Sequence, residues 1–301
     1  AELGLHPSHD MRDGGCASDL AGRATDAEFV FSRLRPKFCG PGCFRQAWAL
    51  RARRASRLPS AGLENPSADL TFLGGVVVVV PFRDQLPLQD RRSQLSRFLP
   101  HMKAFLYGVR HAIVIVEQSE DGQKFNRGKL LNVGFKIAGE VLPTMEVFIT
   151  HDVDLLPSRD MLPVYVRPPP ESRAIHLASV WQKYTYKNFL GGVLSFRPSD
   201  FERINGFPNN YWGWGLEDDQ LGLRMAHNGI RTLGVRLGEF EDLDPVNMKS
   251  ILERRDATEV RKHLPWYNAN MFQRGELTLD SDWSTNGLRD LEFEQVDSRA
   301  D

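Results

Sequence analysis

The sequence has few cysteines, little net charge and no long apolar run. It contains 3 cysteines among 301 residues, the last of them Cys43, and its formal net charge is −1. Cys39 and Cys43 could close a small loop, but three thiols are too few to indicate a redox compartment. A near-neutral chain without basic runs interleaved with aromatics is not predicted to bind nucleic acid.

No segment is long and apolar enough to cross a bilayer. The most apolar run, residues 76–82, is far shorter than the roughly 20 residues that a membrane-spanning helix requires. The chain begins with Ala1 and shows no secretory leader. We therefore expect membrane association only through an anchor that this sequence does not contain.

The composition suits a soluble globular protein, with 41% hydrophobic and 26% charged residues. Residues 1–70 are rich in Arg, Ser, Gly, Pro and Asp and show little periodicity, which is typical of unfolded linkers. We predict that residues 1–70 form a largely disordered stem or linker and that residues 71–297 form one folded domain.

Apolar strands and helices alternate after residue 74. Five valines lie between Gly75 and Pro81, and such a run favours a strand buried on both faces of a sheet. The strand–helix alternation predicts an α/β fold that binds ligands at the carboxyl ends of its strands. Pro100 is expected to kink or divide the first helix. The first predicted elements are strand 75–81, helix 95–106, strand 111–117, helix 128–138 and strand 145–150, and later strands are 174–180, 192–196 and 230–235.

Two aspartates directly follow the third strand. Asp152 and Asp154 are two residues apart on an extended backbone, so their side chains point the same way. Paired carboxylates suit Mn²⁺ or Mg²⁺, either of which would neutralise a diphosphate. An aspartate that caps a turn is the simpler alternative, but the position after a buried strand favours the metal site.

A second candidate site lies in residues 205–219, where aromatics and glycines precede three acids. Aromatic faces beside acids suit a sugar, whose C–H face stacks while its hydroxyls hydrogen-bond. The simpler alternative is a helix start, because acids in the first turn favour the helix dipole. The residues concerned are Trp212, Gly213, Trp214, Gly215, Glu217, Asp218 and Asp219.

Two chemistries could use these acids. In glycosyl transfer from a nucleotide sugar, metal at Asp154 would stabilise the departing diphosphate and a second carboxylate would deprotonate the acceptor hydroxyl. In phosphoryl hydrolysis the first aspartate would be the nucleophile. Hydrolases of that kind carry Thr and Gly soon after the pair, whereas this chain has Leu155-Leu156-Pro157, so glycosyl transfer is favoured.

The longer motifs resemble those of the β-1,4-galactosyltransferases, in the family's order and spacing. They are residues 81–83 (PFR), 125–135 (FNRGKLLNVGF), 151–154 (HDVD), 191–192 (GG), 205–219 (NGFPNNYWGWGLEDD) and 286–288 (NGL). Residues 99–102, 152–157, 176–179 and 186–187 are more similar to the xylosylprotein branch, which builds the proteoglycan linker. Residues 205–214 are more similar to the branch that acts on N-acetylglucosamine.

The resemblance implies a GT-A (Rossmann-like) fold with a mixed central sheet. It also implies an inverting, Mn²⁺-dependent transfer of galactose from UDP-galactose to a sugar hydroxyl in β-1,4 linkage, with Mg²⁺ as an alternative ion. The acceptor would be a glycan or glycoprotein, with xylose of a proteoglycan linker favoured over N-acetylglucosamine. The implied location is the Golgi lumen, as a type II membrane protein.

The resemblance also assigns roles to individual residues. Asp154 would bind the metal, and Trp214 would close over donor and acceptor. Glu217 and Asp218 would bind the acceptor, with Asp218 as the general base. The implied contacts with the UDP-sugar are Pro81, Phe82, Arg83, Phe125, Arg127, Asp152 and Val153.

Three positions depart from the family pattern. Gln85 stands where the family has a second arginine, and Phe189 stands where galactose-selecting members have Tyr, which could relax donor choice towards UDP-N-acetylgalactosamine. The family's metal-binding histidine is missing after the catalytic helix, and Asp242 and Asp244 lie there instead. We hypothesise that one of them replaces the imidazole, an acidic surface turn being the alternative. These departures leave open a catalytically silent relative that only binds nucleotide sugar or glycan.

Overall fold

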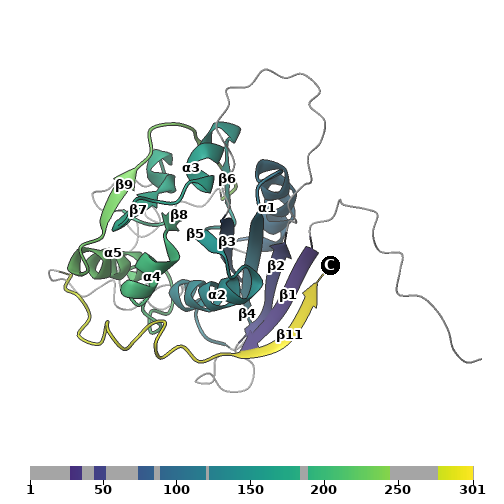
Figure 1. The fold of residues 1–301 in the computed structure, drawn as a ribbon. Helices are drawn as coiled ribbons and strands as arrows, with labels where there is room; N and C mark the ends of the chain where they lie inside the picture. Colours follow the sequence, from purple (N-terminus) through teal and green to yellow (C-terminus); the bar gives the residue numbers. More distant parts are fainter. Residues whose placement is uncertain are drawn as a thin grey trace, which may run out of the picture.

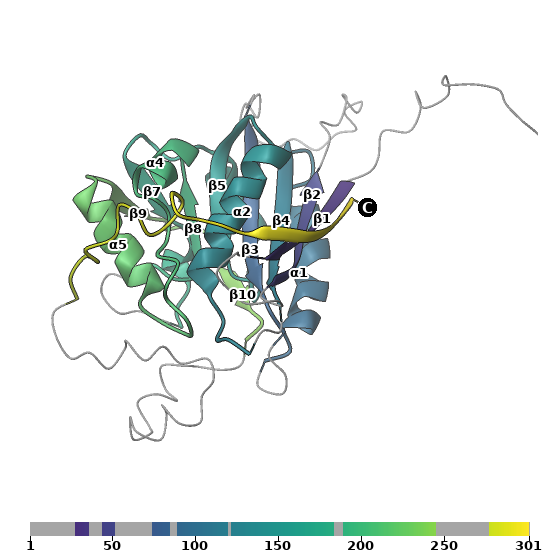
Figure 2. The ribbon, with the colours of Figure 1, turned by 90° about the horizontal axis from the view of Figure 1, so that it is seen from below.

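The computed structural model describes residues 28–35, 44–51, 74–84, 89–119, 122–183, 189–244 and 277–300. They form a mixed sheet with helices on both faces (Figures 1 and 2). Its strands are β1 (Glu28–Arg35), β2 (Phe44–Arg51), β3 (Gly75–Phe82), β4 (His111–Gln118), β5 (Met145–His151), β7 (Arg173–His176), β8 (Val193–Phe196), β9 (Arg231–Gly234) and β11 (Glu294–Ala300). A short second sheet pairs β6 (Leu155–Pro157) with β10 (Phe240–Asp242).

The centre of the sheet is parallel and its flanks are antiparallel. The strand order is β11-β1-β2-β4-β3-β5-β8-β7-β9. β3 runs parallel to both β4 and β5, whereas β8 is antiparallel to β5. This arrangement confirms the predicted α/β class with a mixed central sheet, and it brings the carboxyl ends of β3, β4 and β5 to one edge.

Helices cover both faces of the sheet. The α-helices are α1 (Arg91–Phe105), α2 (Arg127–Val141), α3 (Leu162–Val166), α4 (Pro198–Arg203) and α5 (Glu217–His227), and two short 3₁₀ helices span Arg159–Met161 and Leu177–Val180. Within the described residues, no helix combines the length and apolar character needed to cross a membrane.

The valines of β3 alternate between two hydrophobic cores, as side chains on a strand must. Val77 and Val79 pack in the core formed with α2, α4 and α5. Val76, Val78 and Val80 pack in the core formed with α1 and α3. Burial on both faces explains why this strand consists almost entirely of valine.

α1 runs unbroken through Pro100, so the expectation that this proline divides the helix is wrong. The Asp90 side chain caps the helix by accepting the backbone N–H of Ser93 at 2.9 Å. Phe98 and Met102 are fully buried on either side of the proline. Their burial offsets the hydrogen bond that proline cannot donate.

Two strands lie inside residues 1–70, which we interpreted as a largely disordered stem. β1 and β2 pair with each other, and β2 pairs antiparallel with β4. For residues 28–35 and 44–51 the interpretation is therefore wrong. Arginines interrupt the apolar residues of both segments, and this conceals the alternation by which edge strands are recognised.

Candidate functional site

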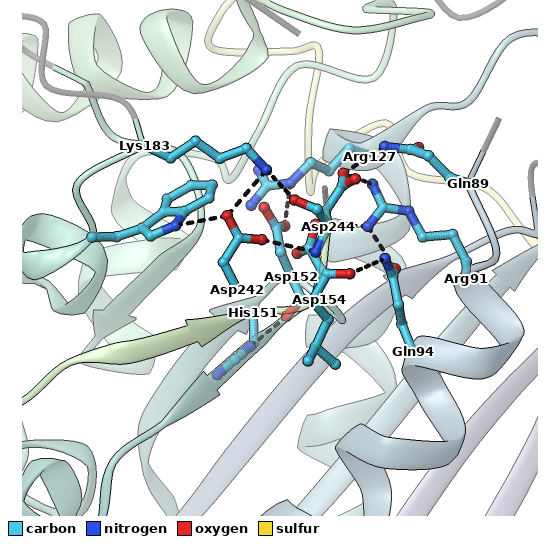
Figure 3. A network of polar contacts seen from close by, with 12 residues as sticks. Gln89, Arg91, Gln94, Arg127, His151, Asp152, Asp154, Lys183, Asp242 and Asp244 are labelled. Atoms are coloured by element: carbon cyan, nitrogen blue, oxygen red, sulfur yellow. Dashed lines mark hydrogen bonds and ion pairs between the residues drawn. The ribbon is translucent and has the colours of Figure 1, made fainter. Parts of the chain in front are cut away.

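The predicted site residues gather at the carboxyl edge of the central strands. Arg83 follows β3, and Asp152 and Asp154 follow β5. Arg127 begins α2, whereas Glu217 and Asp218 lie in the first turn of α5. The sheet topology thus places residues that are far apart in the chain beside one another (Figure 3 shows Arg127, Asp152 and Asp154).

Arg127 connects the two predicted carboxylate groups. Its Nε lies 2.8 Å from Asp152 Oδ1, and its Nη1 lies 3.7 Å from Glu217 Oε1. Its Nη2 also donates to the Gly192 carbonyl at 3.4 Å. Burial would lower the pKa of Arg127, but the charges of Asp152, Glu217 and Asp218 outweigh burial and raise it. The guanidinium is therefore a permanent cation between the two pairs of acids.

His151 holds the backbone that carries the aspartates. Its Nδ1 lies 2.8 Å from the Asp152 carbonyl oxygen, and its Nε2 lies 3.0 Å from the Tyr165 hydroxyl. A carbonyl only accepts, so Nδ1–H is the donor and Nε2 accepts from the tyrosine. Burial lowers the pKa of His151 to about 4, so the ring is neutral near pH 7.

The acid pair of α5 is buried. Glu217 and Asp218 are 7% and 9% exposed, and Glu217 Oε2 makes no hydrogen bond within the described part of the chain. Burial, followed by the Asp218 charge, raises the pKa of Glu217 to about 8. Burial also raises the pKa of Asp218. Because the Asp218 charge acts on Glu217, we infer that Asp218 ionises first and Glu217 holds a proton at neutral pH.

The predicted nucleotide-binding motif and the loop that carries Trp214 meet at Phe125. The Arg83 guanidinium lies 5.6 Å from the centre of the Phe125 ring, and the Gly213 backbone N–H donates to the Phe125 carbonyl at 2.7 Å. Trp214 follows directly and is half-buried. Three motifs that are separated in the sequence therefore share one contact point.

Three other predicted nucleotide-binding residues are buried. Pro81 and Phe82 end β3, and Phe82 and Val153 pack in the hydrophobic core at 3% and 4% exposure.

A second cluster of charges lies beside Asp154 (Figure 3). Arg91 Nη1 is 2.7 Å from Asp154 Oδ2, and Arg91 Nη2 is 3.4 Å from Asp244 Oδ2. Burial would raise the pKa of Asp154, but the Arg91 guanidinium outweighs burial and lowers it. Lys183 Nζ lies 3.1 Å from Asp242 Oδ2. Arg91 thus joins Asp154 to Asp244, while Asp242 pairs with a different cation.

Sequence comparison connects both halves of this site to known proteins. Residues 49–166 match a family described as the N-terminal region of glycosyl transferase group 7. Residues 172–248 match one described as the N-terminal domain of galactosyltransferase. The chain is 35% identical to the solved catalytic domain of Drosophila β1,4-galactosyltransferase 7 in complex with xylobiose, covering 62% of this chain and 82% of that one, with a TM-score of 0.49.

The chain belongs to the β-1,4-galactosyltransferase family. It is 42% identical over 150 residues to β-1,4-galactosyltransferase 7 of Drosophila melanogaster, which is 48% of this chain and 45% of the relative. It is 39% identical over 155 residues to the xylosylprotein 4-β-galactosyltransferase of Caenorhabditis elegans, which is 51% of this chain and 50% of the relative. The chain thus spans about half the length of these relatives.

The metal implied by the galactosyltransferase family fits the cluster at Asp154. Asp154 Oδ1 is buried and has no hydrogen-bond partner among the described residues, so a hard oxygen donor is available. Asp244 is held beside it through Arg91. Asp242 is held by Lys183 and by Trp181, whose Nε1 donates to it at 3.2 Å. Among the described residues, no group of three or more His, Cys, Asp or Glu side chains is arranged to hold a metal ion.

Sequence reasoning missed two cations of the cluster at Asp154, Arg91 and Lys183. Gln85, which we interpreted as the loss of an arginine, lies outside the described residues. Arg91, six residues further along, carries a guanidinium to Asp154. The Arg91-Arg92 pair at the start of α1 was a usable signal, because it follows the predicted nucleotide-binding motif. Nothing in the sequence around Lys183 marks it as a site residue.

Proposed function

We propose that the protein is an inverting, metal-dependent β-1,4-galactosyltransferase that uses UDP-galactose and transfers galactose to a sugar hydroxyl. The single observation that carries the proposal is the position of Arg127. Its guanidinium contacts Asp152 on one side and Glu217 on the other. The residues assigned to the donor and to the acceptor therefore face one another across one cation, as transfer between two bound sugars requires.

In the proposed reaction, Asp218 accepts the proton of the acceptor hydroxyl. The hydroxyl oxygen forms a bond to the anomeric carbon of galactose from the face opposite UDP. The bond between that carbon and the diphosphate oxygen breaks, and its electron pair leaves with UDP. Glu217, which carries a proton, orients the acceptor by donating a hydrogen bond to it. A bound Mn²⁺ or Mg²⁺ would neutralise charge on the departing diphosphate.

The roles of the other residues follow from their positions. Asp154 would bind the metal through its unpartnered oxygen, with Asp244 as the second ligand, in place of the family's histidine. Arg83 and Phe125 would hold the uridine end of the donor, and Asp152 would lie against the galactose. Trp214 would close over both sugars, since glycines on either side of it permit loop movement.

The proposed acceptor is xylose of a proteoglycan linker. Support comes from the xylosylprotein 4-β-galactosyltransferase of Caenorhabditis elegans and from the Drosophila enzyme that was solved with manganese, UDP-Gal and xylobiose, 33% identical to this chain. The proposed location is the Golgi lumen.

A transfer assay tests the proposal. UDP-galactose and Mn²⁺ would be supplied with β-xylosides or N-acetylglucosaminides, and UDP-N-acetylgalactosamine would replace the donor in a parallel series. We expect transfer of galactose to xylosides. Preferred transfer to N-acetylglucosaminides would show that the acceptor is N-acetylglucosamine and not xylose. UDP binding without transfer to any acceptor would indicate a catalytically silent member of the family.

Two substitutions separate the assigned roles. Asp154→Ala and Asp218→Ala should each abolish transfer, a fall of at least about 100-fold in kcat, since one removes metal binding and the other the base. Only Asp154→Ala should weaken metal-dependent UDP binding, measured by calorimetry. Substantial turnover by either variant would contradict its assigned role.

A further inference from the structure

An asparagine joins the loop that carries Trp214 to helix α2. The carbonyl of Asn209 accepts a hydrogen bond from Asn126 Nδ2 at 2.8 Å, and Asn209 Oδ1 accepts one from Asn132 Nδ2 at 2.9 Å. Asn126 and Asn132 are fully buried, and the Asn126 side chain also caps α2. The start of the loop is therefore attached to the same end of α2 that carries Arg127.

The same asparagine also contacts the C-terminal part of the described chain. The Asn209 backbone N–H donates to Asn286 Oδ1 at 2.8 Å. Asn209 Nδ2 donates to the Gly287 carbonyl at 2.7 Å and to Asp290 Oδ1 at 2.8 Å. These partners lie in residues 277–293, which run from beside α5 across α2 to β11 (Figures 1 and 2). Asn209 thus lies between two segments that are distant in the sequence.

Every polar group of Asn209 makes a hydrogen bond. Its two amide hydrogens, its amide oxygen and both of its backbone groups have partners, which accounts for all the donors that an asparagine carries. A polar network that is fully satisfied favours one arrangement of the chain over others. The position and direction in which the loop leaves Asn209 are therefore fixed.

A second attachment to the start of α2 follows four residues later. The Gly213 backbone N–H donates to the Phe125 carbonyl at 2.7 Å. Trp212 lies between the two attachments, and Trp214 follows directly after the second. The loop is thus held at Asn209 and Gly213 before it reaches the acids of α5.

We propose that Asn209 is a positioning residue for the acceptor sugar, which sets acceptor affinity by holding the loop before Trp214 against α2. The inference rests on the proposed function, because it takes Trp214, Glu217 and Asp218 as the groups that meet the acceptor. A misplacement of about 1 Å can cost about 100-fold in rate, so a loosened loop should bind the acceptor poorly. Asp154, assigned to the metal, follows β5 and makes no printed contact with this network, so donor binding should be retained.

Asn209→Asp tests the proposal, because it keeps the shape of the side chain and removes its two donors. It also places a carboxylate beside that of Asp290, whereas the backbone bonds to Asn126 and Asn286 can still form. In assays with UDP-galactose, Mn²⁺ and a β-xyloside, the KM for the xyloside should rise about tenfold or more. The Kd for UDP with Mn²⁺, measured by calorimetry, should stay within about twofold of the wild-type value.

Asn210→Asp is the matched control. It introduces the same charge at the next position of the loop. Asn210 is exposed, and its Oδ1 accepts from Asn286 Nδ2 at 2.9 Å, a bond that an aspartate can keep. The KM for the xyloside should therefore equal that of the wild type. A general loss of folded protein would lower kcat and leave this KM unchanged.

A double substitution tests whether Asn209 acts through its partner. Combining Asn209→Asp with Asp290→Asn exchanges donor and acceptor across one contact and removes the repulsion between two carboxylates. The KM for the xyloside should return to within about threefold of the wild-type value, because contacting residues have non-additive effects. No recovery in the double variant would overturn the inference.

Hydrogen exchange reports the position of the loop without an activity assay. The amide of Gly213 should exchange about tenfold faster in Asn209→Asp than in the wild type or Asn210→Asp, whereas the amides of β3, β4 and β5 should exchange alike in all three proteins. Equal exchange at Gly213, or equal acceleration in the central strands, would contradict the positioning role.

The remaining outcomes are also decisive. An unchanged KM for the xyloside in Asn209→Asp, or an equal loss of UDP binding, would overturn the inference. If Asn209→Asp does not fold, Asp290→Ala, at an exposed position, removes one of the bonds to Asn209 and should raise the same KM about threefold; no rise would contradict the role. Absence of transfer by the wild type would contradict the proposed function, and hydrogen exchange at Gly213 would still test the inference.

Discussion

Glu217 shows how one buried carboxyl links stability to chemistry. Burial and the neighbouring Asp218 raise its pKa to about 8, far above the value of a free glutamate. The folded protein therefore keeps a proton that the unfolded chain has already released near neutral pH. The protonated carboxyl of Glu217 can donate a hydrogen bond to an acceptor sugar. Ionising this carboxyl in the folded protein lowers the stability of the fold.

Glu217→Gln should stabilise the protein more at high pH than at low pH. With a raised folded-state pKa, the stability contributed by the protonated Glu217 is present below about pH 4.5 and is lost as the pH rises through about 8. Glutamine does not ionise and avoids this loss. Urea unfolding should give a variant more stable than wild type by about 1 kcal/mol or more at pH 8 and a smaller difference at pH 5. An equal difference at both values would contradict the assignment.

At the scale of elements, helix α2 lies unusually close to the sheet. A Cβ atom added at Gly134 would lie 2.1 Å from Val79 Cγ1 and 3.1 Å from Val116 Cγ2. A Cβ atom at Gly139, in the same helix, would meet no atom within 4 Å. The close approach at Gly134 matters for function because α2 begins with Arg127, the cation between the two acid groups.

The two glycines of α2 should respond oppositely to alanine. Gly134→Ala overpacks the contact with β3 and β4 and should destabilise the protein by about 1–3 kcal/mol. Gly139→Ala should stabilise it by about 0.5–1 kcal/mol, because alanine is the better helix former. Chemical denaturation of both variants checks the pair. Similar effects of the two substitutions would show that helix propensity, and not packing, controls this helix.

The central elements could be predicted because their sequence signals are local. The valine run predicted a strand over residues 75–81, within one residue of the observed β3, Gly75–Phe82. The pairing of Arg91 with Asp154 joins residues 63 positions apart, and no local pattern contains such a contact. The role of Lys183 is harder to predict, because a single lysine on a loop is expected to be exposed to solvent. Only the fold places Asp242 against it.

At the scale of the whole molecule, one edge of the sheet is built from both ends of the described chain. β1 pairs with β11 on one side and with β2 on the other, and β2 covers β4 (Figures 1 and 2). Without β1 and β2, the backbone of β4 would lie at an open edge. Unpaired edge strands are sites of aggregation, so we expect β1 and β2 to be part of the folded domain.

Shortening the chain tests that boundary. A protein that starts at residue 71 should have a lower melting temperature than one that starts at residue 27, and it should aggregate more readily, because the former lacks the two strands that cover β4. Thermal scans with light scattering measure both properties. Equal melting temperatures and equal light scattering of the two proteins would indicate that residues 28–35 and 44–51 belong to the stem.

The backbone between Trp212 and α5 turns through three left-handed residues, Gly213, Gly215 and Leu216, with φ of 97°, 103° and 74°. Residues with a Cβ atom are strained in this left-handed conformation, whereas glycine is not. For protein engineering, this divides the loop into a fixed frame and one exchangeable position. Trp212 can be varied to seek new acceptors, whereas side chains at 213 or 215 would redirect the chain before it reaches Glu217, and Trp214 is kept to cover the bound sugars.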